Sequence, residues 1–312
     1  MKAVRAGNGG VSVVDLEEPP GSGEVLKIAA ASICSSDLLY IRLGSQRIIG
    51  HELAGVREDG SAAVVEAIIG CNVCDLCRQG RYNLCVEQTK QALGATADGG
   101  IAERFRVPAE RIVPLPTGLD VRDAPLVEPA SVSWHALRLA GIGPNTRVAV
   151  VGAGALGLLA VAGARHQGAP EVALDARHPH QAEAGERLGA TLAHEGLYDV
   201  VVEAAGSDSG LDRAIDLVAP GGTVVCVGVR LENKVGVKWS PLFHREARLI
   251  PSMGYCAHEN GREMEDAAAM LAKDPEIART LITHRFPIAD AAEAFRVAAD
   301  RKAGALRVVI EP

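Results

Sequence analysis

The segment 148–157 constrains the fold more than any other part of the sequence. It reads Val-Ala-Val-Val-Gly-Ala-Gly-Ala-Leu-Gly, so a G-x-G-x-x-G motif joins an apolar strand pattern to an apolar helix pattern. Gly152 permits a tight turn, Gly154 lets the backbone approach a pyrophosphate, and Gly157 allows the helix to pack closely on the strand. The motif in this context predicts a dinucleotide-binding loop. The alternative is a helix whose glycines serve packing alone.

The residues after the glycines extend this predicted site. The helix pattern begins with Ala155 and Leu156, whose backbone amides we expect to bind the pyrophosphate. Asp175 ends the next strand pattern, 18 residues after the last glycine, near the offset of roughly 20 at which an acid binds the adenosine ribose. This carboxylate would repel a 2′-phosphate by about 4 kcal/mol per charge pair at about 4 Å. We therefore favour NAD over NADP, although Arg177, which we count among the cofactor residues, and His178 could offset the repulsion.

Strand and helix patterns alternate around this motif, which predicts a doubly wound parallel sheet. The expected strands are 147–151, 171–174, 199–203 and 223–228, and the expected helices are 155–167, 181–188 and 211–218. The chain before residue 116 instead shows short β patterns separated by turns, at 10–16, 24–30, 62–68, 102–107 and 111–115.

The end of the chain returns to mixed structure. We expect helices at 263–272 and 289–300 and a strand at 306–310. Because the alternation of strand and helix does not continue in this tail, we expect the tail to fold back onto the first domain. The predicted division is a β-rich domain of residues 1–128 and 256–312, and a dinucleotide-binding domain of residues 129–255.

Four cysteines form a compact cluster in the β-rich part. Cys71, Cys74, Cys77 and Cys85 have the spacing C-x2-C-x2-C-x7-C. Zinc in structural sites prefers four tetrahedral thiolates, and two-residue gaps let successive sulfurs turn toward one centre. Two disulfides or four free thiols suit neither a reducing compartment nor this tight spacing. The cluster predicts a closed zinc site that takes no part in chemistry.

A second set of candidate ligands is dispersed along the chain. It consists of Cys34-Ser35-Ser36-Asp37, Gly50-His51-Glu52 and Leu126-Val127-Glu128-Pro129. Taken singly, each is unremarkable, because a lone cysteine is usually a core residue and a glutamate before proline can cap a helix.

In their order, these motifs together resemble the zinc-dependent alcohol dehydrogenases of the medium-chain dehydrogenase/reductase superfamily, over essentially the whole chain. The resemblance implies a GroES-like β-rich catalytic domain and a Rossmann cofactor domain. It implies that Cys34, His51 and Glu128 bind a catalytic zinc, and that Glu52 beside them can enter the metal shell. With the four-cysteine site this makes two zinc ions per chain. A carboxylate at Glu128 resembles the polyol and sugar branch of the family.

The resemblance also implies roles for the residues around the catalytic metal. Zinc with an open position acts as a Lewis acid, which lowers the pKa of an alcohol hydroxyl and favours hydride transfer to the nicotinamide. Ser36 would pass the proton between the alcohol and the cofactor ribose, since a hydroxyl both donates and accepts. Asp37 would accept from the far nitrogen of His51 and fix its tautomer.

The sequence departs from the family pattern at two places. Leu39 stands where many members carry a relay histidine, which puts the route of the proton to solvent in doubt. The segment between Gly55 and Val64 is shorter than in relatives. The resulting expectation is the reversible oxidation of a secondary alcohol in a polyol, sugar or cyclitol. A simple aliphatic alcohol dehydrogenase and a nicotinamide-binding redox sensor without turnover remain as alternatives.

Composition limits the partners. The formal net charge is −7 without a basic stripe, so nucleic acid is not expected as a partner. The apolar run 148–164 is interrupted by glycines, so we expect no membrane span. The N-terminus lacks the apolar core of a secretory signal, which favours the cytoplasm. A small-molecule alcohol or ketone is the expected substrate, and a homo-oligomer, either dimer or tetramer, is the expected assembly.

Overall fold

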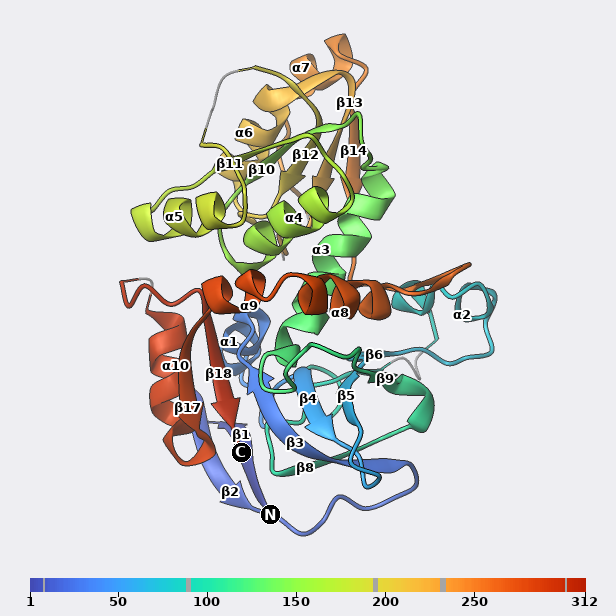
Figure 1. The fold of residues 1–312 in the computed structure, drawn as a ribbon, viewed down its shortest axis with the longest axis vertical. Coiled ribbons are helices and arrows are strands. Elements are labelled where there is room, and N and C mark those ends of the chain that lie inside the picture. Colours follow the sequence, from blue (N-terminus) through green and yellow to red (C-terminus); the bar gives the residue numbers. More distant parts are fainter. Residues whose placement is uncertain (8, 88–90, 193–195, 231–233, 301) are drawn as a thin grey trace. The chain divides into compact units, whose positions relative to one another are not determined.

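The computed structural model describes residues 1–312 except 8, 88–90, 193–195, 231–233 and 301. Contacts between Cα atoms divide the chain into two units (Figure 1). Unit 1 comprises Met1–Glu128 and Cys256–Pro312, and unit 2 comprises Pro129–Tyr255. Within the described residues, every helix is too short or too polar to cross a bilayer.

Unit 1 is built on a seven-stranded, mainly antiparallel sheet. Its order is β17-β18-β3-β4-β5-β9, and β8 also pairs with β3. The strands are β3 (Glu24–Ser32), β4 (Glu52–Val56), β5 (Ala62–Val65), β8 (Arg104–Val107), β9 (Ile112–Pro114), β17 (Ile282–Pro287) and β18 (Arg307–Glu311). Three two-stranded pairs accompany the sheet: β1 (Lys2–Gly7) with β2 (Gly10–Asp15), β6 (Ile68–Ile69) with β7 (Gln91–Ala92), and β15 (Ala257–His258) with β16 (Gly261–Arg262).

Short helices and 3-10 turns complete unit 1. They are α1 (Ser35–Arg42), α2 (Asp75–Arg78), α8 (Glu263–Lys273), α9 (Glu276–Leu281) and α10 (Ala291–Ala299), with 3-10 turns η1 (Tyr82–Leu84), η2 (Ala109–Arg111), η3 (Ala124–Leu126) and η4 (Ile288–Asp290). In the first half of β3, Leu26 and Ile28 are buried while Lys27 between them is exposed, because successive side chains of a strand point to opposite faces. Phe295 of α10 packs into the same apolar cluster.

Unit 2 is a parallel sheet of five strands in the order β11-β10-β12-β13-β14. The strands are β10 (Arg147–Val151), β11 (Glu171–Asp175), β12 (Tyr198–Glu203), β13 (Val218–Cys226) and β14 (Arg248–Pro251). The helices are α3 (Val127–Ala140), α4 (Ala155–His166), α5 (Pro179–Arg187), α6 (Asp208–Leu217) and α7 (Trp239–His244). The first two residues of α3 belong to unit 1. The chain leaves β10 toward β11 but leaves β12 toward β13, in the opposite direction. Right-handed connections therefore place α4 and α5 on one face of the sheet and α6 on the other (Figure 1).

This arrangement confirms the predicted doubly wound fold. The order of the strands reverses between β10 and β12, and ligands of such sheets bind outside the carboxyl ends of the strands at that reversal. Val148, Val150, Leu174 and Val202 are fully buried, as expected for strands covered on both faces.

Several elements differ from those expected from the sequence. The strand expected at 223–228 begins at Val218, because an irregularity in register between β12 and β13 takes up residues 219–222. The strand expected at 62–68 is two strands, β5 and β6. The structure also contains elements that were not expected from the sequence, most of them short: strands β1, β4, β7, β14, β15, β16 and β17 and helices α1, α2, α3, α7 and α9.

Candidate active site

Cys34, His51 and Glu52 meet because of how two strands of unit 1 pair. In the antiparallel ladder of β3 and β4, Ser32 lies opposite Glu52. The residues just beyond this pair are therefore neighbours: Cys34 follows β3 at the N-terminus of α1, and His51 precedes β4. The ligand atoms of Cys34, His51 and Glu52 all lie within 4.8 Å of one another. A thiol, an imidazole and a carboxylate at this spacing form a donor set of the kind that binds catalytic zinc.

Asp37 orients the histidine of this group. Its Oδ1 lies 3.2 Å from Nδ1 of His51, and its Oδ2 accepts from the backbone amide of Cys34 at 2.9 Å. Burial by itself lowers the pKa of His51, but the nearby charge of Asp37 raises it by more than burial lowers it, so the pKa lies well above its ordinary value. With Nδ1 directed at Asp37, Nε2 is the nitrogen left to face a metal.

Ser36 and Tyr40 lie on the side of the group formed by α1. The Oγ of Ser36 is 3.5 Å from Nε2 of His51. Tyr40 follows Ser36 by one helical turn, and burial raises the pKa of its phenol while the charge of His51 lowers it. Leu39, at the position of the missing relay histidine, is half-buried on the same helix. Tyr40 was not singled out in the sequence, where it is one ordinary aromatic residue of a helix that was not predicted.

Glu52 is held by two partners that the sequence did not reveal. The Oγ of Ser32 donates to its Oε2, and Nη1 of Arg307 donates to its Oε1 at 3.0 Å. The same Nη1 donates to the carbonyl oxygen of Ile33 at 2.9 Å. Glu52 is fully buried and the Arg307 side chain is 5% exposed, so this is an interior ion pair. The only signal for Arg307 in the sequence was a charged residue at the start of the apolar strand expected at 306–310.

Glu128 is buried in the first turn of α3, within unit 1. It lies outside the group whose ligand atoms fall within 4.8 Å of one another. The charges of that group still act on the carboxyl of Glu128. Burial raises the pKa of Glu128 to about 7, the positive charge of His51 opposes this rise, and the carboxylate of Glu52 adds to it.

The four clustered cysteines converge in unit 1. The sulfurs of Cys71 and Cys77 are 3.9 Å apart, as are those of Cys74 and Cys85, and all four lie within 4.8 Å of one another. A tetrahedral zinc with Zn–S bonds of about 2.3 Å requires sulfurs about 3.8 Å apart, so the thiols fit the ion. Backbone amides donate to Sγ of Cys71 and lower its pKa to about 6, which favours the thiolate that a metal needs.

The glycine motif in unit 2 is packed as its sequence requires. Gly152 has φ +100°, and a Cβ there would lie 2.7 Å from the amide nitrogen of Ala205, in the loop after β12. A Cβ on Gly157 would lie 1.8 Å from the carbonyl oxygen of Gly152. The carboxylate of Glu203, which the sequence reading missed, accepts from the amide of Ala205 at 3.0 Å and so holds this loop in place.

Gly154 differs from the other two glycines. A Cβ on Gly154 would meet nothing within 4 Å, so its surface is open to a ligand. It is the N-cap of α4, and Ala155 and Leu156 form the first turn, where helix amides lack intrahelical acceptors. An open glycine beside a helix N-terminus fits a pyrophosphate.

Asp175 lies at the carboxyl end of β11, opposite Val151 at the end of β10. Its Oδ2 accepts from Nε of Arg213 on α6 at 2.8 Å. Arg177 is exposed two residues further along. The cation paired with Asp175 is thus Arg213, which was not predicted from the sequence.

Two family models match the chain. Residues 21–117 match the alcohol dehydrogenase GroES-like domain, and residues 122–311 match the glucose dehydrogenase C-terminus. The chain belongs to the zinc-dependent alcohol dehydrogenase family. The predicted family, its GroES-like and Rossmann folds and its oxidoreductase class are thereby confirmed, and the redox-sensor alternative is not supported.

Individual relatives of this dehydrogenase are similar over most of its length. The L-galactonate-5-dehydrogenase of Escherichia coli K12 is 31% identical, with 88% of each chain covered. Sorbitol dehydrogenase 1 of Saccharomyces cerevisiae is 30% identical over 86% of this chain and 85% of its own. A zinc-binding dehydrogenase structure from Sinorhizobium meliloti 1021, bound to NADP, superposes with a TM-score of 0.87 at 28% identity, covering 100% of this chain and 99% of its own.

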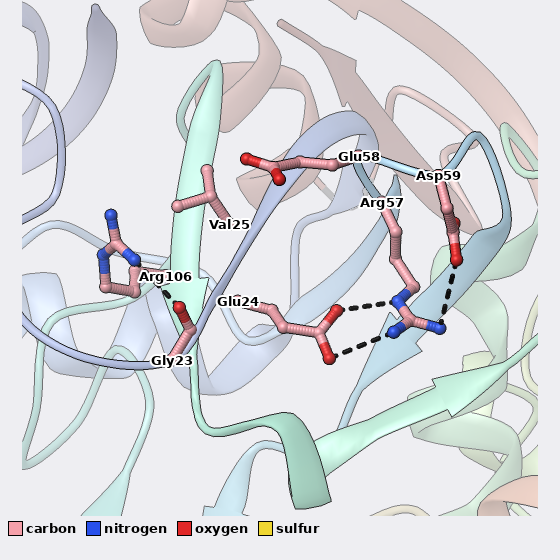
Figure 2. Close-up of a pocket in the computed structure, with 7 residues that line it drawn as sticks. All are labelled: Gly23, Glu24, Val25, Arg57, Glu58, Asp59 and Arg106. Atoms are coloured by element: carbon pink, nitrogen blue, oxygen red, sulfur yellow. Dashed lines mark hydrogen bonds and ion pairs between the residues drawn. The ribbon is translucent and has the colours of Figure 1, made fainter.

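The dehydrogenase also has a surface pocket of about 380 Å³ on unit 1 (Figure 2). Figure 2 shows that Arg57 contacts two acids of the pocket: it donates to both carboxylate oxygens of Glu24 and lies 3.8 Å from Asp59. Arg106 donates to the carbonyl oxygen of Gly23. The pocket lining includes none of the predicted site residues, and we assign it no part in the reaction.

Proposed function

We propose that this dehydrogenase reversibly oxidises a secondary alcohol of a polyol, sugar or cyclitol to the ketone, with NAD preferred to NADP and two zinc ions per chain. The observation that carries the proposal is the convergence of Cys34, His51 and Glu52, in which Asp37 orients the imidazole. The substrates named for two relatives, L-galactonate and sorbitol, support the polyol class.

In this proposal Cys34, His51 and Glu128 hold the catalytic zinc, and Glu52 is the residue that can exchange with them. When bound, zinc supplies Lewis acidity that lowers the pKa of the alcohol hydroxyl. Arg307 balances part of the negative charge of this ligand set, because its guanidinium pairs with Glu52 inside the protein.

The remaining residues of the group position and move protons. When Nε2 of His51 gives up its proton on metal binding, Asp37 keeps the remaining proton on Nδ1, so that the lone pair of Nε2 is available to the metal. Ser36, whose Oγ lies 3.5 Å from that nitrogen, can accept the alcohol proton while it donates its own hydroxyl proton to the cofactor ribose. Ser36 is therefore the first member of the proton route.

The other proposed sites are separate in the chain. Cys71, Cys74, Cys77 and Cys85 hold the second zinc, which is structural because four thiolates close its coordination. In unit 2, Gly152, Gly154 and Gly157 with the amides of Ala155 and Leu156 bind the pyrophosphate, and Asp175 with Arg177 beside it binds the adenosine ribose.

One assay tests the proposed reaction. The zinc-loaded enzyme is mixed with NAD, and NADH absorbance is followed with L-galactonate, sorbitol, other polyols and short aliphatic alcohols. We expect turnover with at least one polyol or sugar acid and a higher kcat/KM than with any aliphatic alcohol. The reverse order would establish the aliphatic alternative, and no turnover with any alcohol would overturn the proposal.

We further propose that the enzyme is a cytoplasmic homo-oligomer. Exposed apolar side chains support the assembly: Trp239 and Phe243 of α7 are 68% and 65% exposed, and Leu249 lies on β14 at the edge of the sheet. Light scattering on the purified chain should give at least twice the monomer mass. The cytoplasm suits thiolates that must stay reduced to bind metal.

A further inference from the structure

The ion pair between Asp175 and Arg213 lies where the adenosine ribose is expected. Asp175 ends β11, and its carbonyl oxygen accepts from the amide of Gly152, the first glycine of the motif, at 3.1 Å. The acid is thus tied to the pyrophosphate loop by its backbone. Its side chain meets Arg213, which reaches over from the middle of α6 with an Nε to Oδ2 distance of 2.8 Å.

The pair remains accessible to a ligand. The Arg213 and Asp175 side chains are 35% and 33% exposed. A half-exposed ion pair adds little to folding stability, because solvent screens it. Its placement beside the glycine loop is therefore more informative about ligand binding than about the fold.

The charges around Asp175 determine whether a 2′-phosphate is attracted or repelled. Asp175 alone would accept from ribose hydroxyls and repel a 2′-phosphate. Arg213 places a permanent positive charge beside the same carboxylate. The exposed Arg177, two residues after Asp175, adds a second positive charge. These three side chains together carry a positive formal charge, although an acid occupies the position typical of NAD-specific enzymes.

We propose that Arg213 is a specificity-determining residue that offsets the repulsion between Asp175 and a 2′-phosphate, so that the enzyme binds NADP as well as NAD. This inference rests on the proposed function, because it concerns the same cofactor site. It is compatible with a preference for NAD, since Asp175 still faces the ribose. The similar zinc-binding dehydrogenase structure from Sinorhizobium meliloti, which holds NADP, supports it.

The test compares the dissociation constants of NADH and NADPH, measured on the zinc-loaded enzyme by fluorescence titration. We expect the ratio of the NADPH to the NADH constant to rise about tenfold in Arg213→Gln, because the positive charge that offsets the repulsion by Asp175 is lost. Arg213→Lys, which keeps the charge, should retain most of the NADPH affinity. High salt should reduce the difference between wild type and Arg213→Gln.

Arg147→Gln is the matched control. Arg147 forms a similar half-exposed pair with Glu171 at the opposite end of the β10–β11 ladder, so its loss should leave the ratio unchanged. An unchanged ratio in Arg213→Gln, or an equal change in Arg147→Gln, would mean that Arg213 only braces α6 against β11. Wild-type enzyme that binds neither dinucleotide would instead overturn the proposed function itself.

Discussion

A buried ion pair at the site depends on one residue distant in sequence. Arg307 on β18 donates to Glu52 and to the carbonyl oxygen of Ile33, and both side chains of the pair are within the core. Removing one partner of a buried pair leaves the other charge uncompensated. We predict that Arg307→Met lowers the free energy of unfolding by about 3–5 kcal/mol, measured by urea denaturation.

A second arginine that pairs with the same strand provides the control. Arg122 binds Glu311, at the far end of β18, but its side chain is 58% exposed. Arg122→Met should therefore cost about 0–1 kcal/mol. Equal losses in the two variants would show that burial does not set the strength of the Arg307 pair.

At the scale of elements, a polar network anchors the four-cysteine loop to the sheet of unit 1. Arg111 donates to the side chain of Asn72, a residue of the loop, at 2.6 Å. It also donates to the carboxylate of Glu66, the residue after β5, at 3.4 Å. Tyr82, in the turn before the last cysteine, donates to the other oxygen of Glu66, and Arg111 lies over its ring at 5.0 Å. The loop backbone is thus positioned by residues that are not zinc ligands.

We predict that Arg111→Met releases zinc from the four-cysteine site roughly tenfold faster, as expected when residues that orient metal ligands are lost. The measurement is the transfer of zinc to a chromogenic chelator, read against Cys71→Ser, which should hold one zinc ion fewer and unfold at a lower temperature. Arg57→Met, which breaks the surface pair with Glu24 in Figure 2, serves as control. Identical release from Arg111→Met and Arg57→Met would refute the anchoring role.

At the scale of the whole molecule, the proposed metal ligands and the proposed dinucleotide loop belong to different units. Cys34 and His51 are in unit 1, and residues 152–157 are in unit 2. We predict that Cys34→Ser loses turnover by at least about a thousandfold, because a missing catalytic group removes several kcal/mol of barrier lowering. The same variant should bind NADH with an affinity close to wild type, measured by calorimetry. Parallel loss of NADH binding and metal would contradict the independence of the two sites.

The sequence predicted those features that are local in the chain. The glycine motif, the four-cysteine spacing and the alternation of strand and helix each depend on neighbouring residues, and they indicated the doubly wound sheet and the positions of Cys71 and Gly152. Some short elements of unit 1, among them β4 and α1, were not predicted, because elements of a few residues carry too little periodicity to be recognised. The predicted start of β13 was wrong, because the register of its pairing with β12 shifts between Val218 and Thr223.

By itself the sequence determined the family, the fold class and the types of residue available for metal and cofactor, because motif spacing acts through local backbone geometry. Only the tertiary structure decided which side chains meet. Ser32 and Arg307 hold Glu52, Arg213 pairs with Asp175, and Glu203 supports the loop beside the glycines. Apart from Glu203, these partners are contributed by strand pairing and helix packing between segments far apart in sequence, and no local pattern encodes such contacts.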